Sequence, residues 1–397
     1  MTPSKLLMTM NAGSSTIKIG LFAVADGQPR NISKSQIDLR ADSLKFQMER
    51  NGERIDINMQ AEVTDDLSAV IDETLTMLAD HFPMDALRVV GHRVVHGGET
   101  FTRPVRLSDD AIAAIADLTS LAPLHQPQAL RLIRAIGHLR PHLLQSASFD
   151  TAFHSTQSDL VRRFALPRTL HDQGIKRYGF HGLSYQFIAS ELFSRAPEIA
   201  SGKVVAAHLG SGASLCALEG GLSRDCSMGF STLDGIPMAT RPGAVDPGVL
   251  LYMLGPLGMS VEEVEDMLYH RSGLLGVSGS SADTRDLQKD DRLEAREAID
   301  IFTLRIAGEI CRMSATLGGL DGIVFTAGIG EHQPLIRAAV SQRLEWLGVK
   351  IDEAANAANA FVISVHDSRV RAFVIPTNEE QVIANEALAI LSKSTMP

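Results

Sequence analysis

Three short glycine-containing segments have the residue types best suited to binding phosphate. They are residues 11–16 (Asn-Ala-Gly-Ser-Ser-Thr), 209–213 (Leu-Gly-Ser-Gly-Ala) and 326–331 (Thr-Ala-Gly-Ile-Gly-Glu). Glycine has no Cβ, so backbone N–H groups in such a turn can approach an anion closely. Each segment alone is more typical of a hairpin turn than of a phosphate site, but three in one chain favour nucleotide phosphate binding. The chain contains neither GxxxxGK[ST] nor a complete GxGxxG, so the P-loop and dinucleotide interpretations lack their signatures.

Basic side chains in apolar or glycine-rich settings form a second group of candidates. Arg93 lies in Gly-His-Arg-Val-Val-His-Gly-Gly (91–98), Arg241 in a Thr-Arg-Pro-Gly loop and His181 in Phe-His-Gly. A planar guanidinium binds carboxylate or phosphate with two parallel hydrogen bonds, although a structural salt bridge is the alternative for each arginine. Lys18, just beyond the first glycine turn, is either a phosphate contact or a solvated strand lysine. His92-Arg-Val-Val-His lacks the HExxH pattern, which argues against a metal pair there.

Acidic residues at predicted strand ends form the third group. The segment 146–150 predicts a strand ending at Asp150, and Glu379 and Glu380 follow a predicted strand over 371–375. Ligand sites of α/β proteins gather at strand ends, and Mg²⁺ prefers one or two such oxygens together with substrate phosphates. For the glutamates, the alternative is a helix N-terminus that attracts acidic residues.

These candidates need a framework of alternating strands and helices. Apolar residues recur at helical spacing over 67–78 and 291–317. Ser108 and Pro127 are typical of helix starts. The segment Ser260-Val-Glu-Glu is a capping box, and Gly273 is the expected end of the helix that it begins. Strand-like runs alternate with these helices, which predicts an α/β fold with a largely parallel or mixed sheet. Residues 6–22 and 204–218 share a strand–Gly-Ser–strand plan, in which Gly13-Ser14 matches Gly210-Ser211. This echo predicts two related domains that face one cleft.

Composition restricts the partners. The chain of 397 residues has 37 Lys+Arg and 47 Asp+Glu, a net charge of −10, and only 5% aromatic residues, which excludes nucleic acid as the default ligand. No apolar run reaches the ~20 residues of a membrane span, and the start shows no signal-peptide pattern. Three cysteines without CxxC spacing are typical of reduced thiols. We therefore expect a cytoplasmic protein without membrane partners.

Ten motifs in order give the chain a recognisable pattern, and it resembles the acetate kinase family, which is close to the propionate and butyrate kinases. The resemblance extends from about Leu6 to Leu391 and rests on NAGSSTIK (11–18), VGHRVVHGGETFT (90–102), LAPLHQP (121–127), FDTAFH (149–154), YGFHGLS (178–184), AHLGSGAS (207–214), MGFSTLDG (228–235), TRPGAVDPG (240–248), FTAGIGEH (325–332) and PTNEE (376–380).

The resemblance implies the superfold of actin, heat-shock ATPases and sugar kinases. In that fold, two ribonuclease-H-like α/β domains flank a nucleotide-binding cleft. One domain is expected from residues 1–150 plus 380–397, because the family's last helix returns to the N-terminal domain. Residues 151–379 are expected to form the nucleotide-binding domain. A homodimer is also implied by the family.

The resemblance further implies an activity and its residues. The expected reaction is reversible, Mg²⁺-dependent transfer of the ATP γ-phosphoryl group to acetate by direct in-line transfer, giving acetyl phosphate and ADP, with Mn²⁺ as a substitute metal. Asn11 and Glu379 match metal positions; Asp150, His181 and Arg241 match catalytic ones. Substrate contacts match Arg93, Val95, Leu124, Phe180 and Thr232. Nucleotide contacts match Lys18, His208, Leu209, Gly210, Ser211, Gly212, Asp283, Thr284, Arg285, Gly328, Ile329, Gly330, Glu331 and His332.

A carboxylate with a pKa near 4 is already ionised at neutral pH, so its attack needs no general base. We therefore expect Asp150 to orient an arginine or a metal-bound water rather than to transfer a proton. Four motifs of the family are altered here. LGNG contains Ser211, and GEN ends in His332. FHGTSH contains Leu183 and ends in Tyr185, and FTPLEG contains Ser231 and Thr232. Thr232 replaces a proline of the acyl pocket. One methylene gives only ~1–3 kcal/mol of discrimination, so propionate remains an alternative acceptor.

Two other classes of function remain open. A nucleotide-dependent binding switch would use the same superfold but has no need of an arginine clamp for a carboxylate. A sugar kinase should present a base and several polar sugar contacts, which the apolar set of Val95, Leu124 and Phe180 argues against.

Overall fold

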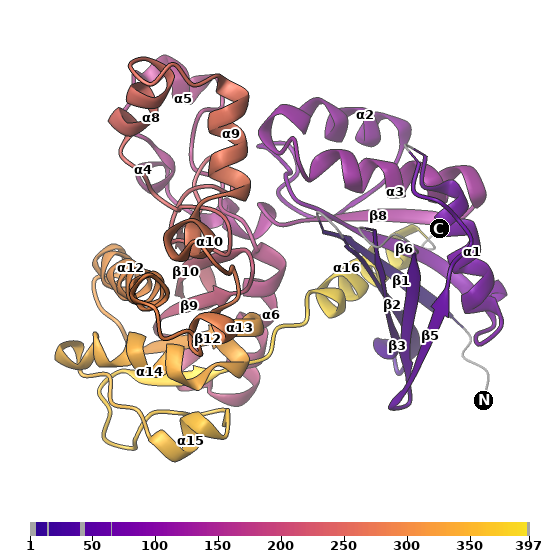
Figure 1. Ribbon diagram of the computed structural model, residues 1–397. Helices are drawn as coiled ribbons and strands as arrows, with labels where there is room; N and C mark the ends of the chain where they lie inside the picture. Colours follow the sequence, from indigo (N-terminus) through magenta and orange to yellow (C-terminus); the bar gives the residue numbers. More distant parts are fainter. Residues whose placement is uncertain (1–4, 14–15, 40–43, 65, 395–397) are drawn as a thin grey trace. The chain divides into compact units, whose positions relative to one another are not determined.

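The computed structural model describes residues 5–13, 16–39, 44–64 and 66–394. The chain divides into two compact units, and Figure 1 traces both. The first unit comprises Met1–Phe153 with Asn378–Pro397, and the second comprises His154–Thr377. The first glycine turn includes Ser14, which lies outside the described residues. No helix in the described ranges is both long and apolar enough to cross a membrane.

An eight-stranded sheet is the framework of the first unit. Its strand order is β5-β4-β3-β2-β1-β6-β8-β7. The strands are β1 (Leu6–Ala12), β2 (Thr16–Ala25), β3 (Gln28–Asp38), β4 (Lys45–Arg50), β5 (Glu53–Asn58), β6 (Leu87–Val94), β7 (Val105–Arg106) and β8 (Leu144–Phe149). Strands β1 to β5 form an antiparallel meander, whereas β6 runs parallel to β1, and β8 runs parallel to β6.

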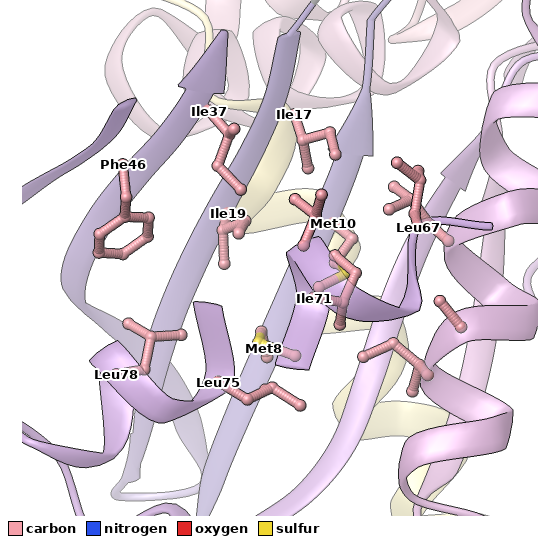
Figure 2. Packing of buried hydrophobic residues seen from close by; sticks show 14 of the residues in the cluster. Met8, Met10, Ile17, Ile19, Ile37, Phe46, Leu67, Ile71, Leu75 and Leu78 are labelled. Carbon is pink, nitrogen blue, oxygen red and sulfur yellow. The ribbon is translucent and has the colours of Figure 1, made fainter. Parts of the chain in front are cut away.

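Helices cover both faces of this sheet, so β1 is buried on both faces. They are α1 (Ser68–Ala79), α2 (Asp109–Asp117), α3 (Gln126–Leu139) and α16 (Glu379–Ser394), with short 3-10 turns at Met84–Ala86, Leu118–Leu121 and Ala152–Thr156. Leu6, Met8 and Met10 pack in a core with α1 and α3, part of which Figure 2 shows. The alternate residue Leu7 packs with the α16 residues Ala384 and Ala387. Because side chains alternate along a strand, every odd-numbered position of β1 faces α16.

The second unit is built on a five-stranded sheet of order β11-β10-β9-β12-β13. Its strands are β9 (Lys203–Leu209), β10 (Ala213–Glu219), β11 (Leu222–Cys226), β12 (Gly322–Thr326) and β13 (Arg371–Val374). Its helices are α4 (Asp159–Arg162), α5 (Arg168–Asp172), α6 (Gly182–Arg195), α7 (Pro197–Ala200), α8 (Pro247–Leu254), α9 (Val261–His270), α10 (Gly273–Ser278), α11 (Thr284–Leu287), α12 (Leu293–Leu317), α13 (Ala327–His332), α14 (Pro334–Gln342) and α15 (Glu353–Ala357), with a 3-10 turn at Glu345–Leu347.

The two sheets share one plan. In each, a hairpin (β1–β2 or β9–β10) continues into a third antiparallel strand, and two further strands lie parallel beside the first strand of the hairpin. The segments β3-β2-β1-β6-β8 and β11-β10-β9-β12-β13 are therefore equivalent. The predicted mixed α/β fold and the predicted repeat of the hairpin are confirmed.

Local helix signals are mostly confirmed, with one error. Ser260 and Glu263 form the predicted capping box of α9, and α12 ends at Gly318 in a left-handed conformation. Gly273 does not stop α9, which ends at His270; instead it opens α10 with a φ of +61°. A Cβ at Gly273 would collide with the carbonyl groups of Met238 and Arg241. This glycine therefore allows α10 to approach the Arg241 loop.

Three buried histidines belong to the cores of the units. His92 and His96 lie in the first unit and His154 in the second, each at most 1% exposed. His92 Nε2 lies 2.7 Å from the Gln145 amide, and strand β6 ends before His96, so the two rings do not share one regular strand face. Burial lowers the pKa of each of the three imidazoles to about 4.

This burial predicts loss of stability in acid. An unfolded histidine takes up a proton near pH 6.5, whereas the folded ones do so only near 4, so stability falls as the pH is lowered from about 6.5 to 4. Each histidine contributes up to ~1.4 kcal/mol per pH unit. Urea unfolding of the wild type and of His92→Gln, measured between about pH 7 and 5, should show a shallower pH slope in the variant. Equal slopes would contradict the assignment to His92.

Candidate active site

In the first unit, three predicted site residues lie at one edge of the sheet. Asn11 is next to last in β1, Arg93 is next to last in β6, and Asp150 directly follows β8. These strands are parallel neighbours, with Met10 paired to His92 and Val94 to Phe149, so their carboxyl ends meet. Asn11 and Arg93 both occupy odd positions, on the face that α16 covers. A Cβ at Gly91, on that same face of β6, would meet Ile383 of α16 at 2.7 Å.

Arg93 joins these strand ends through a fork of hydrogen bonds. Its Nε donates to Asp150 Oδ1 at 2.9 Å and its Nη2 to Asp150 Oδ2 at 2.5 Å. Its Nη1 donates to Asn11 Oδ1 at 3.0 Å. The Arg93 side chain is 16% exposed and that of Asp150 only 1%. Such a paired and largely desolvated geometry fixes the plane of the guanidinium.

The first turn of α16 adds two carboxylates to this cluster. Asn11 Nδ2 donates to Glu379 Oε2 at 3.0 Å and to Glu380 Oε1 at 3.4 Å, and Arg93 Nη1 lies 3.9 Å from Glu379 Oε2. Burial acts to lower the pKa of Arg93, but the charges of Asp150, Glu379 and Glu380 raise it above its ordinary value. The guanidinium is therefore permanently charged.

Three carboxylates and one guanidinium leave the first-unit cluster with a net negative charge. Asn11 and Glu379 offer amide and carboxylate oxygens, the donors that Mg²⁺ prefers. Within the described ranges, no group of three His, Cys, Asp or Glu side chains forms a ready-made metal site. The donor set thus fits a hard cation held by one or two protein ligands together with water and substrate oxygens.

Lys18 lies beside this cluster on β2. It pairs with Asn11 across the β1–β2 hairpin, and its side chain is exposed. Residues that are directly opposite in an antiparallel pair project from the same face. Lys18 can therefore reach a ligand near Asn11 from solvent.

In the second unit, the predicted residues Arg241 and His181 converge on the turn between β9 and β10. A Cβ at Gly212 would lie 2.7 Å from Arg241 Nη2 and 3.5 Å from His181 Nε2, so a side chain there would displace the end of Arg241. The turn is closed by a hydrogen bond from the Gly210 N–H to the Gly212 carbonyl, 3.2 Å long. A guanidinium, an imidazole and a glycine backbone thus meet at one point.

Arg241 is held without a carboxylate partner in the described part of the chain. Its Nη1 donates to the Thr232 carbonyl at 2.8 Å. Burial lowers the pKa of Arg241, while the nearby Tyr269 acts in the opposite direction. A largely buried guanidinium whose charge no acid neutralises is a strong attractor for an anion.

His181 and His208 form a stacked pair beside the same turn. Their ring centroids are 4.2 Å apart and the ring planes are inclined by 14°. His181 Nδ1 lies 2.8 Å from Ser214 Oγ, and His208 Nδ1 lies 2.8 Å from Ser184 Oγ. Both Nε2 atoms face the glycine turn, because a Cβ at Gly210 would lie 3.7 Å from His208 Nε2.

A pocket of about 450 Å³ in the second unit brings together most of the predicted nucleotide contacts. Its walls include residues of the β9–β10 turn, of the start of α11 and of helix α13. The wall residues are Gly210, Ser211, Ala239, Ala282, Asp283, Thr284, Arg285, Gly328, Ile329, His332 and Gln333. A Cβ added at Gly328 would meet nothing within 4 Å, so there is open space beside the backbone for a ligand.

Several predicted contacts lie outside the walls of this pocket. Leu209 is buried in β9, and Gly330 packs on the backbone of Phe325. Glu331 accepts a hydrogen bond from the Thr377 N–H at 3.0 Å, which ties α13 to the segment before α16. These residues are neighbours of wall residues in the sequence and do not line the pocket themselves.

Sequence reasoning missed Ala239, Ala282 and Gln333 as pocket residues. Gln333 Oε1 accepts from Thr284 Oγ1 at 2.7 Å and from Gln288 Nε2 at 2.8 Å, and so joins α11 to the end of α13. Its position directly after the Gly-Glu-His motif was the available signal. The two alanines carry no chemical signal.

The four apolar or hydroxyl residues of the predicted acyl pocket belong to different units. Val95 is 4% exposed and Leu124 is 37% exposed, both in the first unit. Phe180, at 1%, and Thr232, at 9%, belong to the second unit. In the second unit, the Thr232 carbonyl contacts Arg241, so Thr232 lies beside the cationic group.

Known proteins match this chain over nearly its full length. The model of the acetokinase family matches residues 6–385. An acetate kinase of Methylocella silvestris is 43% identical over 98% of this chain and 99% of its own, and one of Rhodopseudomonas palustris is 45% identical over 96% and 97%. A solved propionate kinase of Francisella tularensis has a TM-score of 0.91 at 32% identity, covering 97% of this chain and all of its own.

A solved acetate kinase of Porphyromonas gingivalis has a TM-score of 0.88 at 31% identity, covering 98% of this chain and all of its own. Fold, motif order and sequence identity therefore agree, and the chain belongs to the acetokinase family.

Proposed function

We propose that this protein catalyses reversible, Mg²⁺-dependent transfer of the γ-phosphoryl group of ATP to acetate, giving acetyl phosphate and ADP by direct in-line transfer. The observation that carries the proposal is the convergence of Arg241 and His181 on Gly212. This cationic point adjoins the pocket that is lined by the predicted nucleotide residues. The names of the most similar relatives are consistent with it.

In the proposed mechanism, catalysis depends mainly on positively charged hydrogen-bond donors that bind the phosphoryl group. Negative charge on the equatorial oxygens of a transferring phosphoryl group is stabilised by hydrogen-bond donors fixed in advance. Arg241 and His181 supply these donors, and the glycine turn lets the phosphates approach them. Bound Mg²⁺, held through Asn11 and Glu379, would neutralise charge on the phosphate oxygens. Mn²⁺, with similar ligand preferences, is a substitute.

Arg93 is suited to hold the acceptor carboxylate. Three of its five N–H groups donate hydrogen bonds to Asp150 and Asn11, which leaves two for a ligand, and Nη1 lies 3.9 Å from Glu379 Oε2, beyond hydrogen-bond distance. A carboxylate can accept from such a pair of N–H groups. Because acetate is already ionised at neutral pH, Asp150 has to orient Arg93 rather than remove a proton.

Propionate is the alternative acceptor. Thr232 stands where the family motif has proline, and a solved relative is named as a propionate kinase. The extra methylene of propionate changes binding by only ~1–3 kcal/mol, so the two acids differ in degree.

The proposed activity is tested by trapping acyl phosphate with hydroxylamine in the presence of ATP, Mg²⁺ and an acid series from formate to butyrate. We expect the highest kcat/KM with acetate and loss of product when EDTA removes the metal. A higher kcat/KM with propionate would make that acid the substrate. No acyl hydroxamate with any acid would contradict the proposal.

The role of Asp150 predicts the behaviour of Asp150→Asn. The amide turns an N–H toward the Arg93 guanidinium and loses one charged hydrogen bond, so kcat/KM for acetate should fall about 10- to 100-fold. A matched control is Asp225→Asn, which removes another buried carboxylate, 2.7 Å from Arg312 Nη1. The control should lose stability but keep kcat/KM. Near-normal turnover of Asp150→Asn would show that Asp150 does not orient Arg93.

We also propose a cytoplasmic homodimer. Helix α8 has no buried residue and exposes Leu251 (70%) and Tyr252 (56%), an unusual apolar surface for a monomer. Light scattering should give twice the chain mass of 42.8 kDa, and Leu251→Asp with Tyr252→Asp should give the single mass. A monomeric wild type would contradict the dimer. The location rests on an ATP substrate and on free cysteines.

A further inference from the structure

The His181 imidazole is held by a chain of two buried hydroxyl groups. Ser214 Oγ lies 2.8 Å from His181 Nδ1, and Tyr185 Oη lies 2.5 Å from the same Ser214 oxygen. Ser214 and Tyr185 are both fully buried. His181 precedes α6, Tyr185 lies in its first turn, and Ser214 lies on β10. The first turn of α6 and strand β10 therefore jointly fix the position of the imidazole ring.

The direction of these hydrogen bonds follows from counting donors and acceptors. Burial raises the pKa of Tyr185 well above its ordinary value, so the phenol keeps its proton. A buried hydroxyl proton needs an acceptor. The phenol oxygen meets the backbone of His208, which acts as a donor because it lowers the Tyr185 pKa, so Ser214 Oγ is the acceptor that the described contacts offer. Tyr185 is therefore the donor to Ser214.

The proton of Ser214 then has one destination. The contacts of its hydroxyl group in the described ranges are with Tyr185 Oη and His181 Nδ1, and the first is already the donor. The Ser214 proton must point to Nδ1, which makes Nδ1 an acceptor. In a neutral imidazole the other nitrogen then carries the proton. That nitrogen, Nε2, faces Gly212 beside Arg241.

We propose that Tyr185 and Ser214 are positioning residues that fix His181 with its proton on Nε2, aimed at the transferring phosphoryl group. The assignment deepens the proposed function and rests on it for the role of His181. Tyr185 stands at a position where the family motif FHGTSH ends in histidine, so the device uses a residue particular to this chain.

The backbone at His181 supports a positioning role. His181 has a left-handed conformation, with a φ of +56° and a ψ of +26°. A non-glycine residue seldom adopts this conformation unless its surroundings hold it there. The bond to Ser214 and the stack on His208 both act to hold the ring.

The test combines NMR of ¹⁵N-histidine-labelled full-length protein with kinetics. His181→Gln identifies the His181 signals. In the wild type, Nδ1 should have the chemical shift of an unprotonated nitrogen and Nε2 that of a protonated one. In Tyr185→Phe and in Ser214→Ala this pattern should be lost or averaged. The kcat should fall about 3- to 10-fold, the effect of one hydrogen bond, while KM for ATP changes less than twofold.

A matched control is Tyr178→Phe. It removes a phenol group of the same unit that lies three residues before His181 and donates to the Gly174 carbonyl at 2.8 Å. The control should keep both the His181 spectrum and kcat. Equal losses of kcat in Tyr185→Phe and Tyr178→Phe, with unchanged His181 signals, would overturn the proposal.

Two other results would also overturn it. One is a protonated Nδ1 in the wild type, and the other is Tyr185→Phe with an unchanged spectrum and unchanged kcat. Failure of the proposed function can be distinguished from failure of this positioning role, because in the first case the wild type would form no acyl phosphate. The NMR spectrum needs no substrate, so it reports on the Tyr185–Ser214–His181 chain either way.

Discussion

The hydrogen-bonded fork between Arg93 and Asp150 is the constraint on which the first unit's site depends. One guanidinium joins the ends of β1, β6 and β8, and the glutamates of α16 complete its surroundings. Removing one partner of such a buried pair would leave an uncompensated charge, which is far more costly than the pair's net contribution to stability. The fork therefore sets the orientation of the two N–H groups proposed for the substrate carboxylate.

The two units use the same strand plan for opposite electrostatic purposes. In the first unit, the strand ends collect carboxylates around a single arginine. In the second, the equivalent hairpin turn lies beside Arg241 and two imidazoles, with no carboxylate paired to Arg241 in the described ranges. A cation suits the first arrangement and a phosphate the second. The net charge of −10 is a sum over the whole chain, and it does not reveal the local positive centre at Arg241.

Local patterns predicted much of this arrangement, because strand ends, caps and glycine turns depend on adjacent residues. Asp150 at the end of β8 and Glu379 at the start of α16 follow from such patterns. Contacts between distant segments could not be predicted in this way. Neither the His181–His208 stack nor the Tyr185–Ser214 bond has a local signal, because each depends on how α6 packs against β9 and β10. Gly273 was misread because its role is a close approach to the Arg241 loop and not a helix end.

The bond between Asn11 and Glu379 spans 368 residues of the chain. During synthesis, the strands of the first unit emerge before the second unit, but the helix that covers their Asn11 and Arg93 face emerges after it. The intervening residues 154–377 form the whole second unit. A ribosome-bound chain therefore holds an incomplete acidic cluster until α16 has been released.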